Sequence, residues 1–278
     1  MKYVPVLDKG FRPMYAEFKK YSEEAAKTEN KLLKICVERN DGYNYIYEYK
    51  IFANGHKDEN NLMAERIVKT ILWLVGGYKI YLAGDENVYE FIKAAYTDKG
   101  IRAFDKNFME RVYEKPFEVI MCDEKNFPKE KKCSLSVGGH LDGCRIGFDA
   151  GGSDRKVSAV IDGKVVYSEE VVWFPKINSD PDYHYNEILT ALKTAASKMP
   201  RVDAIGVSSA GVYVNNKIMV ASLFLKVNDE DFEKKVKTMY IDVAKELGEN
   251  IPLEVANDGD VTALAGAIDL NDDSVLGI

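Results

Sequence analysis

Cysteines, histidines and long apolar runs are scarce in this sequence, and each shortage excludes a class of protein. The 278 residues include four cysteines, without a CxxC pair, and three histidines without a common spacing, so neither a zinc site nor a disulfide framework is indicated. The longest apolar run, Ile71–Val75, is too short to cross a bilayer, and the first residues lack the apolar core of a signal peptide. We therefore expect a cytoplasmic protein with reduced thiols, no membrane segment, and surface positions for His56, His140 and His184.

Basic residues are outnumbered by acidic ones. Lysine and arginine total 38, aspartate and glutamate total 45, and the net charge is −7. Binding to nucleic acid or to acidic membranes requires a basic surface, so we expect neither as a partner. The hydrophobic content of 46% and charged content of 30% are typical of a soluble globular protein, and the length allows one large or two medium domains.

The first 122 residues are predicted to form a small α/β domain. A charged segment at 11–28 has helical spacing, and two strands, Lys31–Glu38 and Tyr43–Ile51, flank the turn Asn40-Asp41-Gly42. Helices and strands then alternate over Asn60–Val75, Tyr78–Ala83, Glu86–Tyr96 and Pro116–Cys122. Tyrosines at 43, 45, 47 and 49 share one face of the second strand, where they either pack beneath a helix or stack against a sugar.

Residues 123–143 are predicted to be a linker, because they are polar, highly charged and rich in glycine toward their end. Residues 144–278 are predicted to form a second domain with the order β-β-β-α-β-α-β-α. Its strands are expected at Cys144–Asp149, Lys156–Ile161, Lys164–Val172, Val202–Val207 and Leu253–Ala256, and its helices at Tyr185–Lys198, Asp229–Leu247 and Asp260–Ile268. Ser274–Ile278 is expected to begin a further strand.

The segment Asp149-Ala150-Gly151-Gly152-Ser153 follows the first of these strands. Two adjacent glycines let the backbone approach a phosphate closely and point its N–H groups at the phosphate oxygens. An aspartate at the strand end is placed to hold Mg²⁺ through water, and a serine donates a hydrogen bond. The alternative interpretation is an ordinary glycine hairpin with a polar rim.

The segment Asn257-Asp258-Gly259-Asp260 lies where a buried strand meets a helix rich in small residues. An aspartate at such a junction can accept a proton from a hydroxyl group that attacks phosphorus, and the asparagine can hold neighbouring hydroxyls. The alternative interpretation is capping of the helix by Asp258. Between the two segments, Val207–Val212 leads a strand into a loop of very small residues that leaves room for a ligand.

These three segments together resemble the motifs of ROK-family sugar kinases. The first is similar to the family's DxGGT phosphate loop with serine in place of threonine, the second to its asparagine–aspartate segment, and the loop to the one before its sugar site. The resemblance covers residues 144–278, about half of the chain. It implies an α/β fold in which this half is a ribonuclease H-like lobe of the actin-like ATPase type, preceded by a smaller α/β domain.

The resemblance also implies site residues and cofactors. Asp258 would be the catalytic base, and Asn257, Ala210 and Gly211 would contact a sugar. Phosphate and magnesium would be held by Asp149, Gly151, Gly152 and Ser153. ATP and Mg²⁺ are the implied cofactors, a small sugar is the implied substrate, and the family is compatible with a homodimer. Asp154 stands where the family often has lysine, and we expect Arg155 or Lys156 to supply that charge.

The sequence departs from the pattern of the ROK family in two ways that affect the expected activity. The histidine and cysteine zinc motif of many ROK proteins is absent, and the chain ends where the second phosphate loop and the adenosine-binding lobe would follow. We expect an incomplete and inactive portion of a longer kinase. The alternatives are a substitute lobe supplied by the first 120 residues, a non-catalytic sugar-binding or regulatory protein, and an α/β domain in which both motifs are merely structural.

Overall fold

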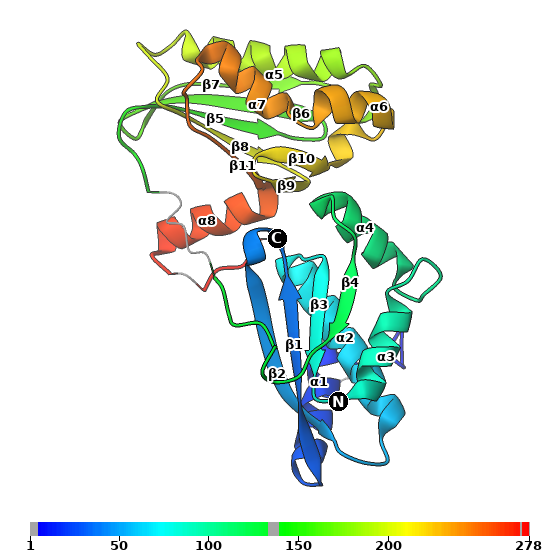
Figure 1. Ribbon diagram of the computed structural model, residues 1–278. Helices are drawn as coiled ribbons and strands as arrows, with labels where there is room; N and C mark the ends of the chain where they lie inside the picture. Colours follow the sequence, from blue (N-terminus) through cyan, green and yellow to red (C-terminus); the bar gives the residue numbers. More distant parts are fainter. Residues whose placement is uncertain (1–4, 133–138, 273, 278) are drawn as a thin grey trace. The chain divides into compact units, whose positions relative to one another are not determined.

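The chain divides into two compact units, Met1–Ser134 and Leu135–Ile278. The computed structural model describes residues 5–132, 139–272 and 274–277. The division falls inside the predicted linker 123–143, of which residues 133–138 lie outside the described ranges. Each unit has its own main sheet (Figure 1) and its own apolar core.

The first unit contains a four-stranded sheet in the order β2-β1-β3-β4, in which only β3 and β4 pair in parallel. The strands are β1 (Asn30–Glu38), β2 (Asn44–Phe52), β3 (Lys79–Ala83) and β4 (Glu118–Met121). The helices are α1 (Met14–Ala26), α2 (Lys57–Val75), α3 (Glu86–Ala95) and α4 (Ala103–Tyr113). Helix α4 was not predicted from the sequence.

The tyrosine row of β2 is part of the packing of the first unit. Tyr49 is buried, Tyr45 and Tyr47 are half-buried, and the ring of Phe18 from α1 lies 5.7 Å from that of Tyr49. Burial raises the pKa of Tyr47 and Tyr49, as expected for phenols removed from water. The row therefore packs beneath a helix, which is one of the two interpretations considered.

The second unit contains a five-stranded sheet in the order β11-β8-β5-β6-β7. Its strands are β5 (Cys144–Ala150), β6 (Asp154–Ile161), β7 (Lys164–Val172), β8 (Ala204–Ser209) and β11 (Leu253–Asn257). Strands β5, β6 and β7 form an antiparallel meander, and β8 and β11 add in parallel on the other side of β5. This is the predicted ribonuclease H-like topology. Because β1 and β3 are antiparallel, the first unit does not repeat it, and a substitute lobe finds no support there.

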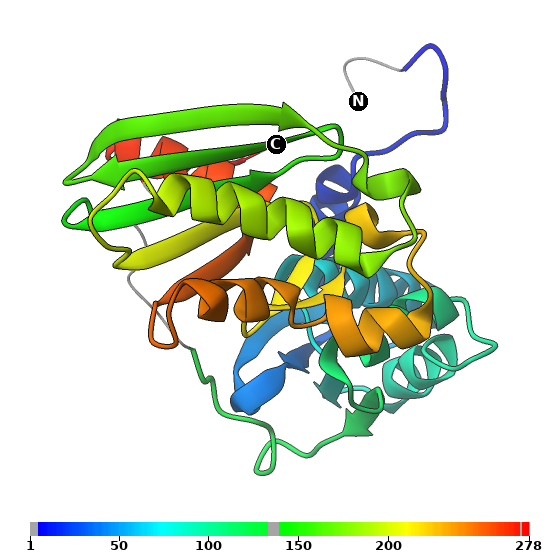
Figure 2. The ribbon, with the colours of Figure 1, turned by 90° about the horizontal axis from the view of Figure 1, so that it is seen from above.

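Helices cover the two faces of the second sheet unequally. Helices α5 (Pro181–Ala196) and α7 (Met239–Leu247) pack on one face, and α8 (Asp258–Leu270) lies on the other (Figures 1 and 2). The inward-facing residues Ile146, Phe148 and Val207 are almost completely buried with α5 and α7, whereas α8 has no buried residue. The core thus lies on the α5–α7 side of the sheet.

The remaining elements of the second unit lie in the segments that connect these strands and helices. They are β9 (Val212–Val214), β10 (Lys217–Val220), α6 (Asp229–Asp231), and short helical turns at Pro175–Ile177, Ser222–Phe224 and Phe232–Val236. The expected single helix Asp229–Leu247 is interrupted by the π-helical turn Phe232–Val236, in which the N–H of Lys237 donates a 2.9 Å hydrogen bond to the carbonyl of Phe232, five residues earlier. The carbonyl of Lys237 then accepts a hydrogen bond from the N–H of Ile218 in β10, and α7 begins two residues later.

Two further expectations are corrected. The described residues 274–277 form no strand, whereas residue 278 of the expected strand Ser274–Ile278 lies outside the described ranges. His184 is fully buried and not at the surface, because its two ring nitrogens each lie 3.0 Å from a carbonyl oxygen, of Asp180 and of Pro175. No helix among the described residues combines the length and apolar character needed to cross a bilayer.

Candidate functional site

Parallel pairing brings the three motifs of the second unit to one edge of the sheet. In register, Ala150 of β5 lies beside Ser209 of β8, and Ser209 lies beside Asn257 of β11. The residues that follow each strand therefore leave the sheet at neighbouring points. The carboxyl edge of parallel strands is where open α/β sheets bind their ligands.

Side chains from other segments contact the glycine turn between β5 and β6. The indole Nε1 of Trp173 donates a 2.8 Å hydrogen bond to the carbonyl of Gly151. A Cβ atom at Gly151 would lie 2.6 Å from the carbonyl oxygen of Asp154, and one at Gly152 would lie 2.6 Å from Nζ of Lys176. The backbone contact makes glycine necessary at position 151, whereas at position 152 the flexible Lys176 side chain could move aside.

Asn257, and not Asp258, is the N-cap of α8. The Asn257 Oδ1 accepts a 2.8 Å hydrogen bond from the N–H of Gly259, and its Nδ2 donates a 2.9 Å bond to the carbonyl of Gly211. The amide therefore joins the small-residue loop to the start of the helix. This leaves the Asp258 carboxylate on the first turn of α8, with one oxygen 3.0 Å from the Gly259 N–H.

The small-residue loop continues into a tight hairpin. Asn215 and Asn216 both have positive φ, of 52° and 64°, as the centre of a type I′ turn between β9 and β10 requires. The amide of Asn216 also bonds the edge strand β11, through Leu253 O and Val255 N, each at 2.8 Å. Burial raises the pKa of Tyr213 in β9 to about 12, so its hydroxyl stays protonated near neutral pH.

A cavity of about 460 Å³ opens where these segments meet. Five of the predicted site residues line it: Asp149, Ala210, Asp258 and the two glycines, Gly151 and Gly152. Three do not: Ser153, whose hydroxyl bonds the Asp154 carboxylate at 2.9 Å, and Gly211 and Asn257, which bond each other. The segments that contain Asp149 and Asp258 therefore line the same cavity.

Lys176 lines the same cavity and was not predicted from the sequence. It lies on the short turn Pro175–Ile177 after β7, and the bond between His184 Nε2 and Pro175 O fixes that turn against α5. No described side chain forms an ion pair with Lys176. A single lysine in a loop has no periodicity or spacing, so the sequence gives no signal for it.

The two basic residues expected to supply charge to the glycine turn differ. Arg155 is 5% exposed and pairs with Glu187 at 2.9 Å and Glu169 at 3.5 Å, away from the turn. Lys156 bonds the Asp154 carboxylate, and hydrogen bonds from Lys156 and then Ser153 lower the pKa of Asp154. The ammonium group of Lys156 also lies 3.9 Å from Asp149, so Lys156 brings positive charge to the two carboxylates that flank the turn, and Lys176 adds a second ammonium group beside Gly152.

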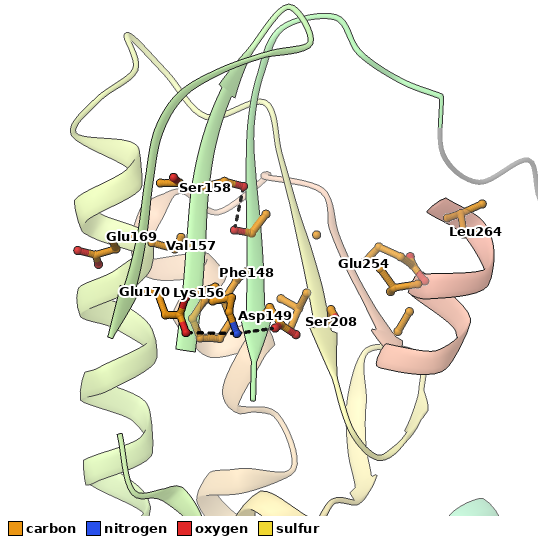
Figure 3. A pocket seen from close by; sticks show the side chains of 16 residues that line it. Phe148, Asp149, Lys156, Val157, Ser158, Glu169, Glu170, Ser208, Glu254 and Leu264 are labelled. Atoms are coloured by element: carbon orange, nitrogen blue, oxygen red, sulfur yellow. Dashed lines mark hydrogen bonds and ion pairs between the residues drawn. The ribbon is translucent and has the colours of Figure 1, made fainter. Parts of the chain in front are cut away.

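A second, larger cavity of about 730 Å³ lies on the α8 side of the sheet. Small outward residues line it, among them Gly147, Ser158 and Gly206, with Val261 and Leu264 of α8 at its margin. Figure 3 shows Lys156 in this cavity between Asp149 and Glu170, whose carboxylate oxygens lie 3.9 Å and 3.8 Å from its Nζ. Asp149 lines both cavities.

The residues of the smaller cavity suit a phosphate group better than a metal held by protein alone. No group of three metal-binding side chains occurs among the residues that the structure describes. Asp149, whose side chain is 42% exposed, offers one carboxylate, which suits Mg²⁺ because that ion retains several waters. The accessible backbone of the glycine turn and the Lys176 ammonium match the needs of an anion.

Comparison by sequence finds no matching protein-family model and no similar curated protein. Solved structures similar to this chain include a ROK family transcriptional regulator described as a homologue of the E. coli MLC protein, with 18% identity, coverage of 46% of this chain and 31% of that chain, and a TM-score of 0.35. A ROK hexokinase from Thermus thermophilus shares 17% identity over 45% of this chain and 38% of that one, with a TM-score of 0.33.

A glucokinase from Parabacteroides distasonis shares 20% identity over 46% of this chain and 34% of that chain, with a TM-score of 0.38. The matched part of this chain thus spans about a third of the length of each of the three proteins. The strand order of the second unit is that of a ribonuclease H-like fold.

Proposed function

We propose that the second unit is the sugar- and phosphate-binding lobe of an ATP-dependent sugar kinase, with Asp258 as the base. The observation that supports this most is the shared cavity of about 460 Å³, which Asp149, Asp258 and the Gly151–Gly152 turn line together. A sugar hydroxyl beside Asp258 and a phosphoryl group at the glycine turn would then meet within one small space.

The chemistry needs few protein groups. ATP would supply the phosphoryl group, and a bound Mg²⁺ would reduce its negative charge. Asp258 accepts the proton of the sugar hydroxyl as that oxygen forms its bond to phosphorus and the bond to the departing ADP oxygen breaks. The glycine-turn backbone and Lys176 stabilise negative charge, and Asp149 is the residue that would hold the Mg²⁺ ion. Asn257 holds Asp258 in place through its bonds to Gly259 and Gly211.

The test is ADP release, with Mg²⁺, ATP and a panel of hexoses and N-acetylhexosamines, by a protein in which this chain is joined to the adenosine-binding lobe that a kinase requires, since the chain alone is expected to be inactive. We expect sugar-dependent turnover that falls about 100- to 10,000-fold in Asp258→Asn, because general-base catalysis contributes that factor. Unchanged turnover in Asp258→Asn refutes the assigned base. Absence of turnover, together with sugar binding in calorimetry, would instead indicate the non-catalytic sugar-binding alternative.

Lys176 allows a separate test of the phosphate side. Lys176→Ala should weaken binding of Mg·ATP or of inorganic phosphate about tenfold, because it removes the ammonium group closest to the glycine turn. Lys226→Ala, an exposed lysine of the same unit, is the matched control and should bind normally. Equal binding by both variants would show that the glycine turn does not receive phosphate beside Lys176.

A further inference from the structure

His184 is a fully buried titratable side chain that takes no part in the proposed chemistry. Its Nδ1 lies 3.0 Å from the carbonyl oxygen of Asp180, and its Nε2 lies 3.0 Å from the carbonyl oxygen of Pro175. A neutral imidazole has one N–H group and one lone pair, so it can donate to only one of these two oxygens. The doubly protonated ring donates to both. The contacts of His184 therefore fit the imidazolium form.

The side chains packed around the ring are uncharged. They are the rings of Trp173, Tyr183 and Phe224, with centroids 4.9–6.4 Å from that of His184. The charged side chains within a helical turn of His184 or next to the residues that it contacts, with their ion-pair partners, are Asp180, Asp182, Glu187, Lys176, Arg155 and Lys235. The three carboxylates of this set bond other groups, and among the described residues no carboxylate bonds the ring. The two carbonyl oxygens thus determine which form of the ring fits.

The contact with Pro175 matters because the next residue is Lys176. Phe174 and Ile177, on either side of this pair, are 59% and 74% exposed, so few apolar contacts attach the turn Pro175–Ile177. Hydrogen bonds attach it instead: the N–H of Phe174 donates to the Tyr183 hydroxyl at 2.9 Å, and the carbonyl of Pro175 accepts from His184. With the turn in this position, Nζ of Lys176 lies beside the glycine turn.

A neutral His184 would direct a nitrogen lone pair at one carbonyl oxygen, and the repulsion would shift the ring. The carbonyl of Asp180 is fixed at the first turn of α5, where it also accepts from the Tyr183 N–H. The Pro175 turn is the less constrained partner, so its contact should lengthen and Lys176 should move with it. Histidine is the side chain that ordinarily changes its charge between pH 5 and 8. The position of Lys176 is therefore linked to pH.

We propose that His184 is a positioning residue for the anion side of the smaller cavity. Its doubly protonated form holds Lys176 beside Gly152, and loss of one proton releases the turn that carries this lysine. This role rests on the proposed function, because it requires that the glycine turn and Lys176 bind a phosphate or a similar anion. It adds to that function a dependence on pH, with anion binding strongest under mildly acidic conditions.

The test is calorimetric titration of the full chain with sulfate at pH 6 and pH 8, because sulfate keeps the same charge at both. The wild type should bind about three- to fivefold more weakly at pH 8, as expected for the loss of one hydrogen bond. His184→Gln keeps a donor but does not titrate, so it should bind equally at both pH values. His56→Gln, which alters an exposed histidine of the first unit, should keep the wild-type difference.

Lys176→Ala identifies the residue through which His184 acts. It should bind sulfate about tenfold more weakly than the wild type at pH 6, as expected for the loss of a charge-assisted hydrogen bond, and equally at pH 6 and pH 8. A second measurement needs no variant: nitrogen NMR of the wild type should show protons on both ring nitrogens of His184 at pH 6. Hydrogen exchange of residues 174–178, corrected for the intrinsic effect of pH, should be faster at pH 8.

Three results would overturn the role of His184. They are equal sulfate binding by the wild type at both pH values, the wild-type pH difference in His184→Gln, and an unprotonated ring nitrogen at pH 6. If these occur while Lys176→Ala still weakens binding, only His184 is rejected and the phosphate site stands. If the wild type binds no sulfate, or Lys176→Ala binds it as the wild type does, the glycine turn is no anion site and both proposals fail.

Discussion

Replacing Asn257 by alanine should increase local opening of helix α8 without unfolding the second unit. Helix α8 has no buried residue, so its stability depends strongly on the contacts at its first turn. Asn257 makes two of these, one to the N–H of Gly259 and one to the carbonyl of Gly211. Asp258, the proposed base, is carried on the same turn.

The expected magnitude follows from these two bonds. Loss of an N-cap costs about 1 kcal/mol, and loss of a neutral hydrogen bond costs about 1 kcal/mol more. The Asp258 carboxylate, 3.0 Å from the Gly259 N–H, retains part of the cap. We therefore expect a loss of about 1–2 kcal/mol in the free energy of opening, which corresponds to roughly 5- to 30-fold faster exchange.

The assay is native-state hydrogen exchange, read by mass spectrometry for peptides within 259–270. Asn257→Asp is the matched variant, because aspartate caps a helix as well as asparagine does but cannot donate to Gly211. It should accelerate exchange only about fivefold, the equivalent of roughly 1 kcal/mol. Peptides from α7, whose residues Val243 and Ala244 are buried in the core, serve as the internal reference and should not change.

Two outcomes would refute this reasoning. If α8 exchanges at the wild-type rate in Asn257→Ala, the cap and the Gly211 bond do not determine its opening. If α7 and α8 accelerate equally, α8 does not open independently, and the absence of buried residues on it has been given too much weight.

Three other predictions concern buried and titrating groups. Arg155→Met should cost about 1–3 kcal/mol in urea unfolding, because it leaves the partly exposed Glu187 and Glu169 carboxylates unpaired, and adding Glu187→Leu should recover part of the loss. Burial raises the pKa of Glu110, but hydrogen bonds from Lys106 and a backbone N–H outweigh it and lower the pKa overall. The folded-state pKa thus lies below the unfolded value of about 4.3, so Glu110→Gln should be less stable than the wild type at pH 7 and the difference should shrink as the pH falls below about 4. Burial raises the pKa of Cys36 to about 12, so iodoacetamide at pH 8 should label it only in urea, as mass spectrometry would show.

The strands were predicted well because alternation and turn residues are local signals. The hairpin at Asp162-Gly163 has positive φ at both residues, 46° and 77°, as its sequence indicates. Helix α4 was missed because Arg102 is not a capping residue and Phe104 is exposed, which weakens the apolar periodicity. The start of α5 was placed late, although Asp180 followed by Pro181 is a regular helix-start signal.

The site was only partly predictable for a different reason. The strand-end positions of Asp149 and Asp258 follow from the strand order, since parallel strands share a carboxyl edge. The roles of Asn257 and Lys176 depend on which loops approach the turn, and those contacts join residues 46 and 24 positions apart, Asn257 with Gly211 and Lys176 with Gly152. The spacing of residues along the chain therefore cannot predict these contacts.

The hairpin at Asn215-Asn216 limits how the second unit can be stabilised by engineering. General turn preferences favour glycine at the second position, so Asn216→Gly would be a standard choice for a more stable variant. Here that change would delete both amide bonds to β11 and leave Leu253 O and Val255 N, at the border of the sheet, without those partners. A substitution that improves the hairpin in isolation would therefore loosen the strand leading to Asp258, and a consensus-based redesign should leave this residue unchanged.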